Sequence, residues 1–316
     1  MKIEKILKWP LTWGRRMMIL VLISASAMGM QILYKYITHR STCESGNMRA
    51  CSDRGFIEAK KGNHAEATKL YKKSCDAGGM HGCYNLGLVY EKNGNLAEAN
   101  LLYKKACDGD IIEGCYNLGV KEDAKGNHAE AKALYIKACD GGQMAGCYNL
   151  GRAEENQGKL AEARLFYMKT CEGARMEGCF NLGVLEDAKG NHTEAKTLYK
   201  KACDGGLGIG CYNLGAQDEQ EGKLDGANTF YKMACEKGVG QGCFDLASGE
   251  ETKGNLVQAN LFFNKACDTG FVQGCYNLGI LEAQKGNDAE ALRLIKKACD
   301  GKMKEACQAL ASLNKQ

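Results

Sequence analysis

The cysteines recur with a fixed period, and this period constrains the fold more than any other feature of the chain. The 18 cysteines form nine pairs, whose members stand eight positions apart, and each pair follows the previous one after 32 positions. A period of about 20 to 50 residues is typical of a repeat solenoid, in which each unit buries its apolar face against its neighbours. We therefore predict one elongated repeat domain over residues 41–316.

Within each repeat the spacing of apolar residues is helical. Cys83, Leu86 and Tyr90 fall on one stripe of a first helix, and Ala99 and Leu102 fall on one stripe of a second. Glycine-rich turns separate the two helices and no proline interrupts the repeats. The pattern predicts an all-α, right-handed α/α solenoid of about eight 32-residue helix-turn-helix repeats, preceded by one N-terminal helix.

An asparagine stands three residues before a glutamate at the start of the second helix in several repeats. This spacing has the form of a capping box, in which the asparagine side chain accepts a hydrogen bond from the first helical turn. The five pairs are Asn63/Glu66, Asn95/Glu98, Asn127/Glu130, Asn191/Glu194 and Asn287/Glu290.

Each cysteine pair flanks a turn between two helices. On one continuous helix, Cys139 and Cys147 would be about 12 Å apart, too far for a disulfide. Gly141 and Gly142 end the helix, however, and an antiparallel return can bring the two α-carbons to about 5.5 Å. We predict a disulfide within each pair: Cys43–Cys51, Cys75–Cys83, Cys107–Cys115, Cys139–Cys147, Cys171–Cys179, Cys203–Cys211, Cys235–Cys243, Cys267–Cys275 and Cys299–Cys307.

Cysteines in this number can also bind zinc, carry out redox chemistry or remain as free thiols. Structural zinc sites normally use closer pairs, and neither a second close pair nor a suitably spaced histidine completes four ligands. A thioredoxin-like redox motif would need a CxxC spacing, which is absent from the sequence. Buried free thiols stay open as an alternative if the compartment is reducing.

The N-terminus indicates which compartment the repeats occupy. Residues 1–16 are basic, and 18 uncharged residues follow Arg16. We predict that residues 1–16 stay in the cytoplasm and that residues 17–37 form a transmembrane signal-anchor, which places the repeats in an oxidising space. The alternative is a cleaved signal peptide ending at about residue 27, after Ala25-Ser26-Ala27.

The charge is concentrated in this leader. Residues 1–40 hold seven of the 42 basic residues and one of the 38 acidic residues. The rest of the chain carries 35 basic and 37 acidic residues and is near neutral. Nucleic acid is therefore not expected as a partner, because phosphate binding requires a strongly basic surface.

Two stretches carry a family resemblance: KACDGGQMAGCYNLG at residues 137–151 and KACDGGLGIGCYNLG at residues 201–215. They resemble the Sel1-like repeat (SLR) family, in particular its Helicobacter cysteine-rich branch, whose α/α hairpins carry one disulfide each. The short turn inside each hairpin is instead similar to that of tetratricopeptide repeats.

The resemblance implies a bacterial protein that binds a protein or peptide on the concave face formed by the first helices. It would sit in the inner membrane with its repeats in the periplasm, or be secreted or periplasmic if the signal is cleaved. The resemblance also implies a second possibility, since some members of the branch are described as penicillin-binding or weakly β-lactamase-active. No catalytic motif of that branch maps onto these residues, and no cofactor, metal or catalytic residue is predicted.

The first helices carry the candidate partner-binding residues. An asparagine recurs two residues after the second cysteine, where it could bond a peptide backbone or instead a neighbouring helix. An acidic pair recurs near the end of the helix, where it could attract a basic partner or instead pair with lysines of adjacent repeats. The candidates are Asn85, Asn117, Asn149, Asn181, Asn213 and Asn277 in the first set, and Glu122, Asp123, Glu154, Glu155, Glu186 and Asp187 in the second.

Two further positions repeat in these helices. The aromatic residue directly after the second cysteine is expected to pack in the core rather than to bind a ligand. Four residues later stand Leu88, Val120, Arg152, Val184, Ala216, Ser248 and Ile280, which differ while the frame around them repeats. Such variation is typical both of a face with repeat-specific contacts and of an unconstrained surface.

Overall fold

The computed structural model describes residues 43–313, which form 17 α-helices and no strand. Two helices make up each repeat, and we call the first the A helix and the second the B helix. The A helices are α2 (Met48–Lys60), α4 (Met80–Lys92), α6 (Ile112–Ala124), α8 (Met144–Asn156), α10 (Met176–Ala188), α12 (Gly208–Gln220), α14 (Gly240–Thr252) and α16 (Val272–Gln284). The B helices are α3 (His64–Asp76), α5 (Leu96–Asp108), α7 (His128–Asp140), α9 (Leu160–Glu172), α11 (His192–Asp204), α13 (Leu224–Glu236), α15 (Leu256–Asp268) and α17 (Asp288–Asp300), with α18 (Lys304–Leu313) at the end.

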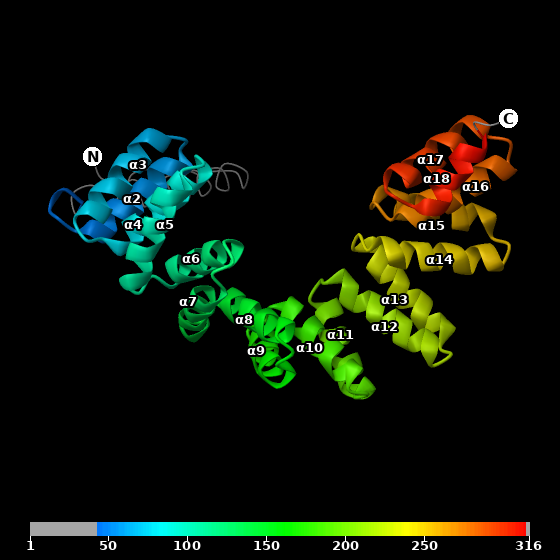
Figure 1. Cartoon of the computed structure of the whole chain (residues 1–316), viewed down its shortest axis with the longest axis horizontal. Helices are drawn as coiled ribbons and strands as arrows, with labels where there is room; N and C mark the ends of the chain where they lie inside the picture. Colours follow the sequence, from blue (N-terminus) through cyan, green and yellow to red (C-terminus); the bar gives the residue numbers. More distant parts are fainter. Residues whose placement is uncertain (1–42, 314–316) are drawn as a thin grey trace, which may run out of the picture. The chain divides into compact units, whose positions relative to one another are not determined.

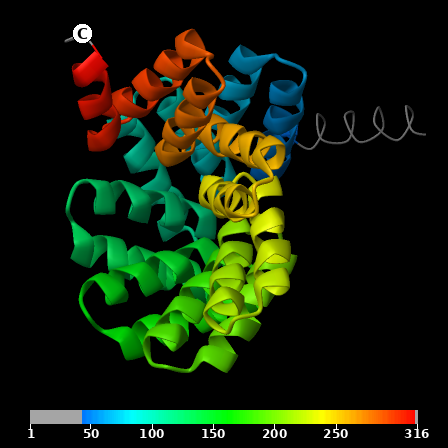
Figure 2. The same cartoon turned by 90° about the vertical axis from the view of Figure 1, so that its right-hand side faces the viewer.

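The helices fall into two compact units, and the boundary along the chain lies between Gln143 and Met144. Within each unit, every helix packs against the helix before it and the helix after it, so that antiparallel hairpins stack side by side (Figure 1). The hairpins of each unit can be followed from a second direction in Figure 2. This arrangement confirms the predicted all-α solenoid of 32-residue repeats.

Close approach of the two helices of a hairpin depends on a glycine in the A helix. In the hairpin of α8 and α9, Leu150 and Tyr167 are completely buried between the helices. A Cβ atom added to Gly151 would lie 2.5 Å from Cε1 of Tyr167, far closer than atoms can pack. In this hairpin the Leu-Gly pair of the A helix and the tyrosine of the B helix therefore fit together as one unit of the core, and most other repeats carry the same three residues.

Most of the inter-helix turns use a glycine in the left-handed conformation, such as Gly206 with φ 97°. Three turns place another residue there: Asp110 (φ 62°), Ala174 (φ 59°) and Lys302 (φ 68°). The turns thus follow the same backbone path with and without glycine.

The cysteine pairs bridge these turns as predicted. Eight of them are disulfides with α-carbons 4.4 to 4.6 Å apart. Cys139 and Cys147 are disulfide-bonded as well, and no cysteine within the described range is free. The zinc, redox and free-thiol alternatives do not describe these residues.

The predicted capping boxes are wrong, although their asparagines do stand at the N-caps. Asn63 and Asn127 make no side-chain hydrogen bond to the helices that they precede. Each instead donates its amide across the turn, Asn63 to Oε2 of Glu58 and Asn127 to Oε2 of Glu122, both at 2.7 Å. The carboxylate of the preceding A helix is a charged acceptor within reach, so it orients the amide away from the helix.

The membrane prediction concerns residues 17–37, which lie outside the described residues. Between residues 43 and 313 no helix combines the length and the apolar character needed to cross a bilayer.

Candidate partner-binding face

The repeated asparagines of the A helices are half-buried between successive repeats. Asn85 donates to Oγ of Ser52 at 3.0 Å, and Asn181 donates to the Tyr148 hydroxyl at 3.4 Å. In both cases the partner belongs to the A helix of the preceding repeat. The amides of these two residues therefore hold neighbouring repeats together, which is the packing alternative considered for this position.

The aromatic residue beside each asparagine packs inside its own repeat. Tyr148 lies against Tyr167, with ring centroids 6.0 Å apart, and Phe180 lies against Tyr199 at 5.8 Å. These tilted pairs join the A helix to the B helix, so the rings serve the core as expected.

The first carboxylate of each candidate acidic pair is buried. Glu122, Glu154 and Glu186 are 7%, 2% and 1% exposed. Glu122 accepts hydrogen bonds from Lys125 at 2.6 Å and from Asn127 at 2.7 Å. A charge with this little exposure is not available to a partner, because its partners within the hairpin already satisfy it.

These contacts also shift the acidity of the buried carboxyls. The Lys125 ammonium, followed by the Asn127 amide, holds the pKa of Glu122 below its usual range. For Glu186 the Asn191 amide is the largest cause of a lowered pKa, with Arg164 contributing further. The carboxylates are therefore charged at neutral pH and bonded in that form.

The second carboxylate of each pair has an internal partner too. Glu155 accepts a hydrogen bond of 2.5 Å from the Tyr167 hydroxyl. Asp123 lies 2.8 Å from Nδ1 of His128, and Asp187 lies 2.7 Å from Nδ1 of His192. Asp123 is the most accessible of the three, with a side chain that is 51% exposed. The acidic ladder thus serves mainly to join the two helices of a hairpin.

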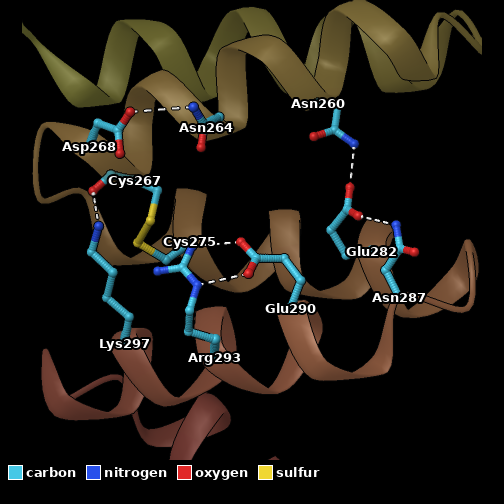
Figure 3. Close-up of polar contacts among 10 residues, drawn as sticks. All are labelled: Asn260, Asn264, Cys267, Asp268, Cys275, Glu282, Asn287, Glu290, Arg293 and Lys297. Carbon is cyan, nitrogen blue, oxygen red and sulfur yellow. Dashed lines mark hydrogen bonds and ion pairs between the residues drawn. A yellow bond between two sulfur atoms is a disulfide. The ribbon is translucent and has the colours of Figure 1, made fainter.

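The buried carboxylates also connect one repeat to the next. Glu186 receives Nε of Arg164 at 2.5 Å, and Glu282 receives the Asn260 amide at 2.8 Å. The donors lie on the B helix of the preceding repeat, at the same position in each case. Figure 3 shows Glu282 between Asn260 and Asn287, which also donates to it at 2.6 Å.

Lysines near the end of the B helices form a second link between repeats. Lys297 donates to the backbone carbonyl of Cys267, a residue of the Cys267–Cys275 disulfide in the repeat before it (Figure 3). Lys201 does the same to Cys171, at 3.2 Å. These carbonyls lie in the last turn of a helix, where they accept an N–H from the following turn, Gly270 for Cys267 and Ala174 for Cys171. An ammonium suits their remaining lone pair at the negative end of the helix dipole. The sequence showed the lysines but gave no sign of this role, since each partner lies 30 residues away.

The varied position of the A helix, five residues after the second cysteine, is directed toward solvent. We call these residues the A-helix face. Phe56, Leu88, Val184 and Ile280 are 53%, 39%, 36% and 37% exposed. The other members are Val120, Arg152, Ala216 and Ser248. Two pairs of successive A helices also contact each other directly, α2 with α4 and α14 with α16.

Between residues 43 and 313, no group of three or more histidine, cysteine, aspartate or glutamate side chains could hold a metal ion.

Two repeat families match the chain. Tetratricopeptide repeats match residues 81–108, 145–172 and 177–204. Sel1 repeats match residues 50–79, 112–143 and 272–302. Both kinds therefore occur on one continuous 32-residue frame. A search of curated protein sequences finds no match.

Several solved structures share the fold. A protective antigen of uropathogenic Escherichia coli strains, which displays an SLR fold, has a TM-score of 0.70 and 21% identity, over 88% of this chain and 67% of its own. A Sel1 repeat protein from Oxalobacter formigenes has a TM-score of 0.70 and 15% identity, over 87% of this chain and 89% of its own. Pseudomonas aeruginosa pilF has a TM-score of 0.50 and 16% identity, over 60% of this chain and 90% of its own. At these identities the likeness concerns the fold.

Proposed function

Since the chain is an SLR-type protein built of Sel1 and tetratricopeptide repeats, we propose that it is a scaffold that binds a protein or peptide on its A-helix face. Solenoids of this kind offer extended surfaces rather than enclosed sites. The observation that carries the proposal is the contrast between the fixed frame and the varied, exposed residues of this face.

The contrast has a physical basis. Burial between helices explains why the glycine, leucine and tyrosine of the frame repeat. Nothing in the packing explains why large apolar side chains such as Leu88 on α4, Val184 on α10 and Ile280 on α16 stand exposed at the same position of their A helices. Exposed apolar side chains of this size are common in protein interfaces.

The B helices expose apolar residues as well, for example Leu101 and Leu165 at 69% and 58%. Close approach between successive helices of the same kind occurs, however, among the A helices, at α2 with α4 in the first unit and at α14 with α16 in the second. Single exposed apolar residues are ordinary on protein surfaces. We therefore assign the partner to the A-helix face.

The acidic ladder does not carry this proposal. Its buried members are neutralised inside the hairpins, so a basic partner would meet few free carboxylates. No observation in the described residues favours the β-lactam-hydrolysing alternative.

We further propose that the repeats work in an oxidising compartment such as the bacterial periplasm. The support is the disulfide in every repeat junction, because such bonds form and persist in exported proteins. Anchoring through residues 17–37 would place them there, and this part of the proposal rests on the sequence alone.

Site-specific photo-crosslinking in cells tests the face directly. A photoreactive residue at Val184 on an A helix is compared with one at Leu165 on a B helix, both in the second unit. We expect a discrete protein adduct at Val184 and none at Leu165. A discrete adduct at Leu165 alone would place the partner on the other surface and overturn the proposal.

A further inference from the structure

A cavity of about 360 Å³ lies between the first two repeats. Its walls include Ala59 and Tyr71 of the first repeat and Val89, Lys92 and Asn93 of the second. Tyr71 is only 4% exposed. Within residues 43–313 its hydroxyl has no hydrogen-bond partner, and burial alone raises the pKa of Tyr71.

Other repeats give the equivalent tyrosine a carboxylate. The acceptor stands on the A helix, eight residues after the second cysteine, and its tyrosine stands on the B helix of the same repeat. In the first repeat this A-helix position is Ala59. The three hydrogen bonds run from Tyr103 to Glu91 (2.5 Å), from Tyr167 to Glu155 (2.5 Å) and from Tyr231 to Glu219 (2.6 Å).

The eighth repeat shows that an alanine at this position is not unusual by itself. Ala283 takes the place of the carboxylate there, but the B-helix residue is Ile295, which has no hydroxyl to satisfy. In two repeats the A-helix position holds an aspartate and the B-helix position holds a tyrosine: Asp123 with Tyr135, and Asp187 with Tyr199. The first repeat is thus the one in which a buried tyrosine faces an alanine, and the cavity occupies the space that a glutamate side chain would fill.

The other groups around the cavity suit a negative charge. No acidic residue lines it, whereas Lys92, Asn93 and His64 can each donate a hydrogen bond. His64 and Ala65 also begin helix α3, whose N-cap Asn63 makes no side-chain capping bond. The positive end of a helix and an ammonium both attract a carboxylate. The apolar walls at Ala59 and Val89 would contact the methylene groups of a longer acidic side chain.

We propose that this cavity receives a glutamate side chain of a protein partner, which replaces the carboxylate that the chain itself lacks at Ala59. The Tyr71 hydroxyl donates to one oxygen, and Lys92 pairs with the carboxylate from the rim. The cavity lies near the hairpin turns and is lined by residues other than those of the A-helix face. A failure of this proposal would therefore leave the scaffold proposal unaffected, and the reverse also holds.

The first experiment tests whether a carboxylate belongs in the cavity. Ala59→Glu in the full chain supplies it from within, and we expect a higher thermal midpoint. Ala283→Glu makes the same change at the equivalent position of the eighth repeat. Its B-helix residue is Ile295, which has no hydroxyl, so the thermal midpoint should not rise. Adding Tyr71→Phe to Ala59→Glu should remove the gain. An Ala59→Glu midpoint no higher than that of Ala283→Glu would overturn the proposal.

The second experiment tests binding from outside. Saturation-transfer NMR on the full chain compares the capped peptide acetyl-Ala-Glu-Ala-amide with its glutamine isostere. We expect the glutamate peptide to bind at least about tenfold more tightly, and Ala59→Glu and Tyr71→Phe each to lose most of that difference. Equal binding of the two peptides, or binding unchanged in both variants, would contradict the proposal. Tighter binding of acetyl-Ala-Ala-Ala with a free carboxyl end would overturn the assignment to a side chain.

Discussion

Single carboxylates near the end of most A helices organise the contacts of this chain. Glu186 and Glu282 are each bonded to the N-cap asparagine that follows in the same repeat and to a donor from the preceding repeat. One side chain therefore fixes both the turn within the hairpin and the contact between hairpins. The same position explains why acids occur near a helix C-terminus, which the helix dipole disfavours.

Replacement of one such carboxylate should be costly at neutral pH. Glu282 accepts from Lys285 at 2.7 Å, and this contact, followed by those of Asn260 and Asn287, lowers its pKa to about 2. We expect Glu282→Gln to reduce the free energy of unfolding by about 1–3 kcal/mol at pH 7, because it removes a charge-assisted network. Urea denaturation of both proteins measures the difference.

The pH dependence distinguishes this cause from a loss of packing. A carboxyl with a pKa lowered from 4.5 to about 2 stabilises the fold above its unfolded pKa and loses this effect as the pH falls between those values. The difference in the free energy of unfolding between the wild type and Glu282→Gln should therefore shrink as the pH is lowered from about 5 to about 2. The exposed Glu251 supplies the control, since Glu251→Gln should change little at any pH. A difference for Glu282→Gln that is independent of pH would refute the electrostatic account.

At the level of the hairpin, the disulfide and the turn act as one element. The Cys203–Cys211 bond joins the end of α11 to the start of α12 across Gly205 and Gly206. Closing nine residues stabilises such a turn by about 2.5 kcal/mol in the chain-entropy model. Since each hairpin contacts only its neighbours, the effect should stay local.

Removal of this one disulfide should loosen its own turn. We expect Cys203→Ala with Cys211→Ala to lower the free energy of unfolding by about 2–3 kcal/mol and to speed proteolytic cleavage near Gly205. Limited proteolysis with mass mapping measures the cleavage. The turn at Gly173, where the Cys171–Cys179 bond is intact, serves as the control in the same molecule. Equal cleavage rates at the two turns would argue against a local role for the bond.

The elements could be predicted from the sequence further than their side-chain contacts could. The 32-residue period and the apolar stripes predict helices, turns and cysteine pairing, because all of these depend on residues near one another along the chain. The Arg164–Glu186 and Lys201–Cys171 contacts join residues 22 and 30 positions apart, so no local pattern reveals them. The capping boxes failed for a different reason, since Glu122, only five positions before Asn127, offers a charged acceptor that competes for the asparagine side chain.

At the scale of the whole molecule, repetition separates two tasks. The frame of glycine, leucine, tyrosine and cysteine recurs in most hairpins and stabilises them in the same way, while the A-helix face differs from repeat to repeat. A 32-residue sequence unit can therefore be copied without loss of packing and altered without loss of fold. The candidate asparagines and acids belong largely to the frame, which the sequence could not distinguish from the face because both repeat with the same period.

Disulfides at every repeat junction are the central feature of this chain, and the proposed export of the repeats to an oxidising compartment depends on them. Acid-trapping of intact cells, alkylation of free thiols under denaturing conditions and peptide mapping of the full chain measure this directly. We predict that none of the 18 cysteines is alkylated and that every bond joins residues eight positions apart. Alkylation of most cysteines before reduction would contradict both the stapled junctions and the export of the repeats.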